Sequence, residues 1–264
     1  MSVDIALNLI KNIPEAQRVF DELNDKKDFS VWFTNEPDML RGDITTAIHE
    51  SVHMIRANTG KYILIEGGWV DAPEKDDILV VAPSKIVHPA LKNSYSGDSF
   101  LETYMTEGEE ASSSADYFSY LLDEFNAYCH DLNVFAKLET LPINSTPRDG
   151  LVAFMLFTLV YLDGAKPLLS DAQKKALVSI WEQAERVLDE TSHIKHISYH
   201  ADKYLNDMAP LLHVMSPYLG RSARDFRSVG HISEKAASEI DVETTERNVP
   251  VYRRLKNWLG IGDD

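Results

Sequence analysis

Hydrophobic residues recur at helical spacing along most of the chain. The stretch 4–24 shows this pattern on both sides of Pro14, which predicts one or two short helices there. The same period predicts further helices over residues 44–58, 112–138, 147–162, 171–192 and 194–215. Asp43 and Gly60 flank the stretch 44–58, and they are typical of a helix N-cap and of a helix stop.

Shorter runs of aromatic and β-branched residues predict a few strands. These runs cover residues 29–33, 62–65 and 78–81, and the last two are expected to pair as a hairpin. The predicted fold class is therefore α+β, with a mostly helical domain over residues 1–220 and a small β-sheet in the N-terminal third. Residues 221–264 are polar, and we expect a tail or wrapping arm that ends in a short helix.

Composition and charge narrow the classes of function. The chain has 264 residues and a formal net charge of −16, and an acidic surface repels nucleic acids and anionic membranes. No apolar run approaches the ~20 residues that a membrane-spanning helix needs. The N-terminus lacks a secretory signal and Cys129 is the single cysteine, so we expect a cytoplasmic protein, or one exported without a classical signal peptide.

One motif carries metal chemistry. His49, Glu50 and His53 form an HExxH pattern inside the helix predicted over residues 44–58. Residues four apart lie on the same helix face, so both imidazoles can bind one metal ion. Glu50 is then placed to act as a general base on a water at that metal. The predicted cofactor is one Zn²⁺ per chain, and no other cofactor site is indicated.

A catalytic zinc needs a third protein ligand and an open fourth position. Two glutamates downstream are candidates for that ligand. Glu124 lies within the helix predicted over residues 112–138, and Glu107 lies just before that helix. The residue types and the spacing leave both open.

The motif and the segment around Glu124 resemble the zincin metallopeptidases, in particular their glutamate-ligand branch, the gluzincins. The pattern Glu124-Phe125-x-Ala127 is similar to the third-ligand helix of the lethal-factor type of toxin proteases. The resemblance implies a zincin-like fold, hydrolysis of peptide bonds, and Glu124 in preference to Glu107 as the third ligand. Tyr128 stands where gluzincins commonly have an aspartate that supports the first histidine.

Several side chains are candidates for the hydrogen-bond donor that stabilises an oxyanion during hydrolysis. The resemblance points to Tyr117, two turns before Glu124, and Tyr120 lies one turn before it on the same predicted face. A histidine-rich stretch contributes His200 as a further candidate, with His196 as its neighbour on one helix face. His130 and Asp131 are expected at the surface, with a supporting role beside the metal as the alternative.

Two other classes of function compete with a peptidase that acts on peptides or proteins. A di-iron carboxylate oxidoreductase would use the Glu-x-x-His pair Glu50/His53, Glu124, and a second pair, Glu190/His193. A non-catalytic interaction protein would retain the motif as a vestigial or structural metal site. The sequence leaves the substrate and the oligomeric state open.

Overall fold

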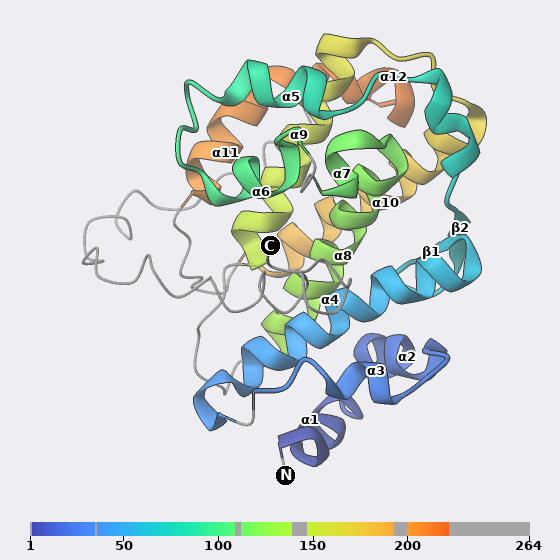
Figure 1. Cartoon of the computed structure of the whole chain (residues 1–264), viewed down its shortest axis with the longest axis vertical. Coiled ribbons are helices and arrows are strands. Elements are labelled where there is room, and N and C mark those ends of the chain that lie inside the picture. Colours follow the sequence, from blue (N-terminus) through green and yellow to red (C-terminus); the bar gives the residue numbers. More distant parts are fainter. Residues whose placement is uncertain (1, 35, 109–111, 139–146, 193–199, 222–264) are drawn as a thin grey trace. The chain divides into compact units, whose positions relative to one another are not determined.

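Two helices of equal length form the centre of the structure and pack against each other. In the computed structural model these are α4 (Leu40–Thr59) and α8 (Phe118–Lys137) (Figure 1). The structure describes residues 2–34, 36–108, 112–138, 147–192 and 200–221. The described residues are mostly helical with one small sheet, which confirms the predicted α+β class.

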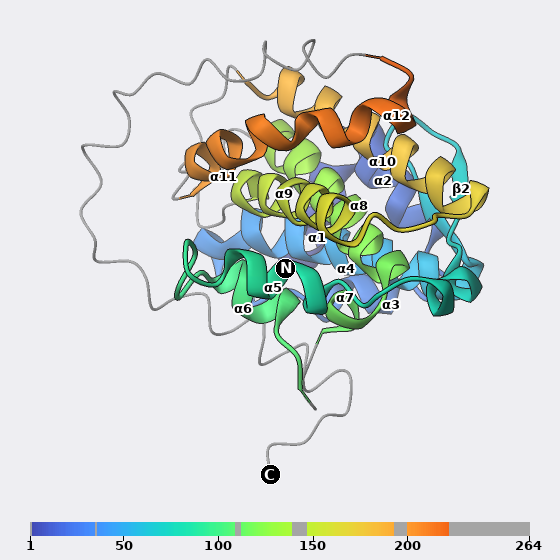
Figure 2. The same cartoon turned by 90° about the horizontal axis from the view of Figure 1, so that it is seen from above.

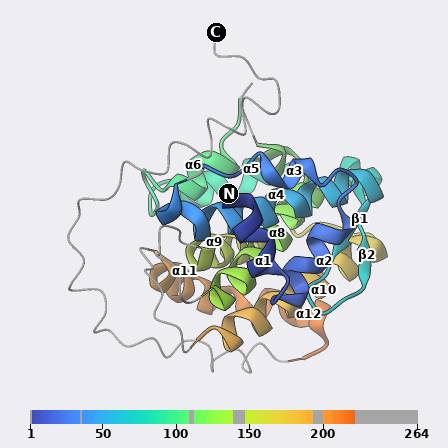
Figure 3. The ribbon, with the colours of Figure 1, turned by 90° about the horizontal axis from the view of Figure 1, so that it is seen from below.

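Three short helices at the N-terminus pack against α4, as Figure 3 shows from below. Pro14 does interrupt the first stretch, because a proline fits the first turn of a helix but not its interior. The strand predicted over residues 29–33 is wrong. Phe29 is buried in a helix, where its ring packs against Phe20 and Phe33. These elements are α1 (Ser2–Ile10), α2 (Pro14–Glu22) and α3 (Lys27–Ser30).

Helix α4 begins earlier than its sequence pattern predicts. The 3₁₀ helix η1 (Pro37–Met39) leads into it, so Asp43 lies within the first turns and is not the cap. The Asp43 carboxylate instead accepts hydrogen bonds from the backbone and the hydroxyl of Thr34. Gly60 ends the helix as predicted, with a φ of 67° that suits glycine, and its N–H donates to the carbonyl of Arg56.

The sheet is smaller than predicted and pairs a different second strand. β1 (Lys61–Ile63) runs antiparallel to β2 (Trp69–Asp71), with Tyr62 opposite Val70. The stretch 78–81 is therefore not a strand, and its start belongs to the 3₁₀ helix η2 (Glu74–Leu79). Gly67 and Gly68 have φ values of 89° and 100°, which favour glycine. They allow a tight reversal of the chain, so that β2, which follows directly, pairs with β1.

The main core surrounds α9 (Pro147–Ala165), which is buried along almost its whole length. Figure 2 shows α9 between α5 and α6 on one side and α10 and α11 on the other. An apolar sequence on all sides of a helix predicts such a central position. The surrounding helices are α5 (Ser84–Leu91), α6 (Ser99–Met105), α10 (Asp171–Glu190), α11 (Ala201–Met208), η3 (Ala209–Met215) and α12 (Ser216–Leu219).

The long helix predicted over residues 112–138 is two helices. The short α7 (Ser113–Asp116) ends at Tyr117, which is extended with φ −129° and ψ 133°. Asp77 then caps α8, because its carboxylate accepts from the backbone N–H of Ser119 at 3.1 Å and 3.2 Å. This cap comes from η2, far away in the sequence, so the pattern of residues 112–138 alone could not indicate the break.

Part of the predicted C-terminal organisation lies outside the described residues. This holds for residues 222–264 of the predicted tail, and for residues 193–199 of the histidine-rich stretch. The helix predicted over 194–215 is described from α11 onward, and it continues as the 3₁₀ helix η3.

Candidate metal centre

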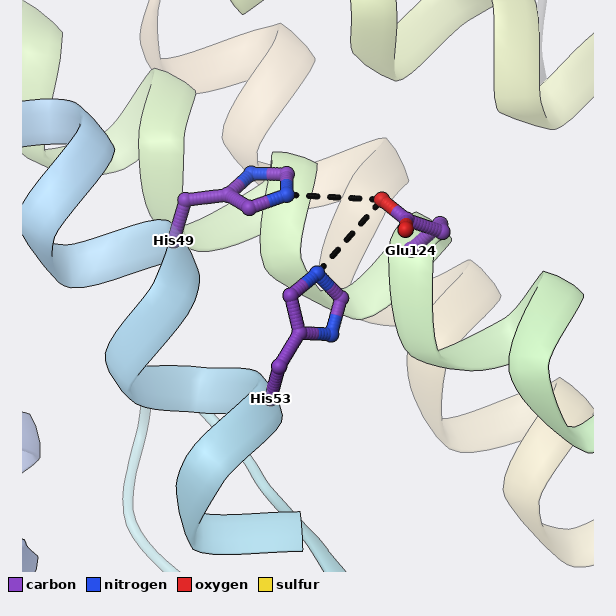
Figure 4. A group of neighbouring side chains, drawn as sticks. All are labelled: His49, His53 and Glu124. Atoms are coloured by element: carbon purple, nitrogen blue, oxygen red, sulfur yellow. Dashed lines mark ion pairs between the residues drawn. The ribbon is translucent and has the colours of Figure 1, made fainter. Parts of the chain in front are cut away.

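The HExxH motif and Glu124 meet where α4 packs against α8. His49 and His53 project from the same face of α4, and Glu124 projects toward them from α8 (Figure 4). The Glu124 Oε2 atom lies 3.3 Å from His49 Nε2 and 3.5 Å from His53 Nε2. One possible ligand atom from each of the three residues lies within 4.8 Å of the other two. Among the described residues, no other group of three or more histidine, cysteine or acidic side chains converges in this way.

Each histidine is oriented by its own aspartate on α8. His49 Nδ1 lies 3.1 Å from Asp131 Oδ2, and His53 Nδ1 lies 2.8 Å from Asp123 Oδ2. A carboxylate only accepts hydrogen bonds, so each Nδ1 carries the proton and donates it. Metal-binding histidines are held in this way in most sites, which fixes the ring and directs Nε2 toward the ion.

The three converging atoms suit a cation. With Nδ1 protonated, a neutral imidazole offers only a lone pair at Nε2, and the Glu124 carboxylate offers only lone pairs as well. The buried Glu124 Oε2 has no hydrogen-bond partner, although both imidazole nitrogens are near it. A metal ion between these atoms would satisfy all three at once, and the donor set of two nitrogens and a carboxylate oxygen is typical of catalytic zinc.

The buried carboxylates of the site also favour a positive charge between the two imidazoles and Glu124. Burial lowers the pKa of His49, but the carboxylates of Asp131 and Glu124 outweigh this effect and raise that pKa to about 10. Burial raises the pKa of Glu124, yet His53 and His49 bring it down to about 2. The carboxylates therefore demand either protons on the imidazoles or a bound cation, and a metal ion replaces those protons when it binds.

Glu50 lies in the same buried region and has no role in holding the histidines. Burial raises the pKa of its carboxyl group, and the electrostatic neighbours of that group are His49, His53, Glu124 and Asp131. A carboxylate of raised pKa next to a metal site is suited to take up a proton and release it again.

Two tyrosines adjoin the ligands. The Tyr128 ring meets the His49 ring edge-on, with centroids 4.8 Å apart. Its hydroxyl lies 3.1 Å from the hydroxyl of Tyr104, which comes from α6. Burial raises the pKa of both tyrosines well above its usual range, so both hydroxyls are protonated at neutral pH. The Tyr128 ring is also pressed against Gly150 of α9, where an added Cβ would overlap it.

Arg56 supports the second histidine from one turn further along α4. Its guanidinium lies 3.8 Å from Asp123, the partner of His53, and forms a 2.8 Å ion pair with Glu74 of η2. The Tyr120 ring lies 3.8 Å below this guanidinium. Tyr120 therefore holds Arg56 through a cation–π contact, which differs from the predicted role at an oxyanion.

Tyr117 and His200 are not brought to the ligands. Tyr117 is 49% exposed, and its ring contacts Tyr120. His200 is exposed at the start of α11, where its backbone N–H donates to Asp149. No hydrogen bond, ion pair or ring contact among the described residues joins either side chain to the three ligands, because each lies on a different element or helix face.

The alternative ligands also lie elsewhere. Glu107 is exposed and pairs with Lys85 at 3.1 Å, so of the two predicted third ligands it is Glu124 that the structure places against the histidines. Glu190 is exposed at the end of α10, away from the converging group, and His193 lies outside the described residues.

Sequence reasoning missed Asp123, Arg56 and Tyr104, and it gave Asp131 a supporting role beside the metal only as the alternative to a place at the surface. Asp131 was expected at the surface, yet it is buried against His49. His130 is buried too, and its Nε2–H donates to the carbonyl of Ile63 at 3.0 Å. One signal was present, since Asp131 follows Glu124 by two helical turns and so shares its face. For Tyr104, on another helix, no such signal exists.

We expect Asp131→Ala to weaken zinc binding about 10–100-fold, because loss of an outer hydrogen-bond partner frees the His49 ring. The measurement is a competitive zinc titration of the purified protein. Asp98→Ala is the matched control, since Asp98 is equally buried but bonds to Tyr204 and to the backbone of Leu101. Equal zinc affinity of wild type and Asp131→Ala, with the fold retained, would contradict the assigned role.

None of the helices in the described residues has the length and apolar character that a membrane crossing needs. Comparison with protein-family models, with curated proteins and with solved structures found no match to this chain.

Proposed function

We propose that this protein is a zinc-dependent metallopeptidase that hydrolyses peptide bonds in peptides or proteins. The observation that carries the proposal is the convergence of His49 Nε2, His53 Nε2 and Glu124 Oε2 next to a buried Glu50. A structural zinc site is usually closed by four protein ligands, whereas a catalytic site has three protein ligands and an open position beside a base such as Glu50.

The reaction follows from the roles of these residues. When bound, zinc would polarise the scissile carbonyl and lower the pKa of water, as it does in other hydrolases. Glu50 accepts a proton from the attacking water, whose oxygen forms a bond to the carbonyl carbon. Glu50 then returns that proton to the amide nitrogen as the C–N bond breaks, which leaves a carboxylic acid and an amine. The second proton of the water then passes from the acid to the amine, so the final products are a carboxylate and an ammonium ion.

The partial exposure of the ligands supports substrate access. The side chains of His53 and Glu124 are 21% and 16% exposed, whereas His49 is 9% exposed. Water therefore reaches the ligands from the side of His53 and Glu124, and an extended peptide would have to approach from that side. We place the substrates in the cytoplasm, with the outside of the cell as the alternative.

The test begins with the metal content of protein purified without a histidine tag or chelator. We expect about one zinc per chain, as in other catalytic sites of this ligand set, and its loss in His49→Ala. The zinc-loaded protein is then incubated with a mixed peptide library, and new termini are detected by mass spectrometry.

Each other outcome overturns the proposal in its own way. Two irons per chain would indicate the di-iron oxidoreductase, as in bundles with paired Glu-x-x-His motifs. Zinc without any new peptide termini would indicate a structural metal site in an interaction protein. Absence of metal after dialysis against zinc would make the motif accidental.

A further inference from the structure

We infer that the hydroxyl pair of Tyr104 and Tyr128 supplies the hydrogen bond that stabilises the substrate carbonyl oxygen as it becomes negative. The role of the pair rests on the proposed hydrolysis at the same site. It replaces Tyr117, Tyr120 and His200, which the fold places elsewhere. The pair comes from two helices, α6 and α8, that are not adjacent in the sequence.

The count of protons shows that one donor is free. Two tyrosine hydroxyls carry two protons, and their mutual hydrogen bond, 3.1 Å long, uses one of them. Among the described residues, neither hydroxyl has a second hydrogen-bond partner. The remaining O–H is therefore available to donate to a substrate oxygen.

The position of the pair matches such a role. The Tyr128 ring touches the His49 ring, and Tyr128 follows Glu124 by one turn on the same face of α8. Through this ring contact the pair adjoins the converging ligands, and the charges of Glu124 and Glu50 contribute to the raised pKa values of both tyrosines. Like Glu124 and His53, both tyrosines are partly exposed.

The pair is held before substrate arrives. The Tyr128 ring stacks on Phe154 with centroids 5.2 Å apart, and Tyr104 meets the same ring edge-on at 5.0 Å. Gly150, one turn before Phe154 on α9, lets the Tyr128 ring lie directly on the helix backbone. Donors fixed in advance stabilise developing charge without the cost of reorganisation.

The first experiment removes each hydroxyl and keeps each ring. We expect Tyr128→Phe and Tyr104→Phe to lower kcat about 10²–10³-fold, the usual cost of one oxyanion donor, with KM and zinc content unchanged. The double variant should lose little more than the worse single variant, because the two hydroxyls act as a unit. Tyr161→Phe is the control, since it removes a hydroxyl that donates to the carbonyl of Val81 instead. Wild-type kcat in both single variants would overturn the inference.

A second experiment tests the placement of the pair through Gly150. A methyl group there would displace the Tyr128 ring, so Gly150→Ala should lower kcat while zinc content stays the same. Gly164 lies on the same helix as Gly150, and a methyl group there would crowd Ile86 of α5 in a similar way. Gly164→Ala therefore shows the cost of crowding without any change at the tyrosines. An equal effect of the two variants on kcat would contradict the placement.

A binding measurement separates failure of this inference from failure of the proposed function. A phosphinic pseudopeptide carries a tetrahedral, negatively charged group that imitates hydrated substrate. We expect zinc-loaded wild type to bind it about 10²-fold more tightly than Tyr128→Phe, even where no peptide is hydrolysed. Hydrolysis by wild type together with equal binding by both proteins would overturn the tyrosine pair alone. Absence of binding to wild type would also overturn the inference.

Discussion

Replacement of Glu50 by glutamine should reduce peptide hydrolysis about 10³-fold or more while the protein keeps its zinc. The amide of glutamine has nearly the size of the carboxylate, but it takes up no proton from water. The three metal ligands are unchanged, and Glu50 makes no hydrogen bond to either histidine. The measurement is kcat/KM on a cleaved peptide, with zinc content determined on the same sample.

The matched control is Glu182→Gln, which makes the same chemical change on the exposed face of α10. We expect wild-type turnover from this variant. Full turnover by Glu50→Gln would show that another group takes the proton from water, and the proposed role of Glu50 would be wrong. Loss of zinc from Glu50→Gln would instead show that this carboxylate supports the metal.

Replacement of Glu124 by alanine should weaken zinc binding more than the ~100-fold that loss of an outer hydrogen-bond partner costs. Glu124 supplies one of the three converging ligand atoms, and the nearest other carboxylates already accept hydrogen bonds from the histidines. The apo variant would also leave His49 and His53 facing one carboxylate fewer. The measurement is zinc content after dialysis, followed by a competitive titration.

Glu107→Ala provides the comparison, since Glu107 was the other candidate for the third ligand. It is exposed and pairs with Lys85, so this variant should retain all of its zinc. Zinc loss in Glu107→Ala with retention in Glu124→Ala would reverse the assignment. Retention in both variants would mean that the metal uses a ligand outside the converging group.

The fold was predictable where one helix carries its own signals. The helices around residues 44–58, 147–162 and 171–192 follow from apolar spacing and end signals such as Gly60. The errors lie where distant contacts decide the structure. Aromatic residues at 29–33 pack as well in a helix as in a strand. The stretch 78–81 was expected to pair with residues 62–65, but β1 pairs with β2 instead.

In the candidate site too, local spacing predicted the residues of one helix, and distant contacts decided the rest. Helical periodicity alone places both histidines of the motif on one face of α4 and Glu50 beside them. The choice of Glu124 over Glu107 depended on a resemblance in the sequence, and the packing of α8 against α4 agrees with it. The resemblance also named Tyr117, whose side chain is exposed and contacts Tyr120, with no contact to the three ligands among the described residues.

Local spacing was enough to place His49, Glu50 and His53 on one helix with both imidazoles on one face, because that geometry depends only on the 3.6-residue turn. The surroundings of these three residues depend on how the helices pack. Asp123 and Asp131 reach the histidines because α8 lies against α4. Tyr104 of α6 reaches Tyr128 of α8 because both helices pack against α9. These contacts join residues far apart in the chain, and local spacing holds no information about which distant helices pack together.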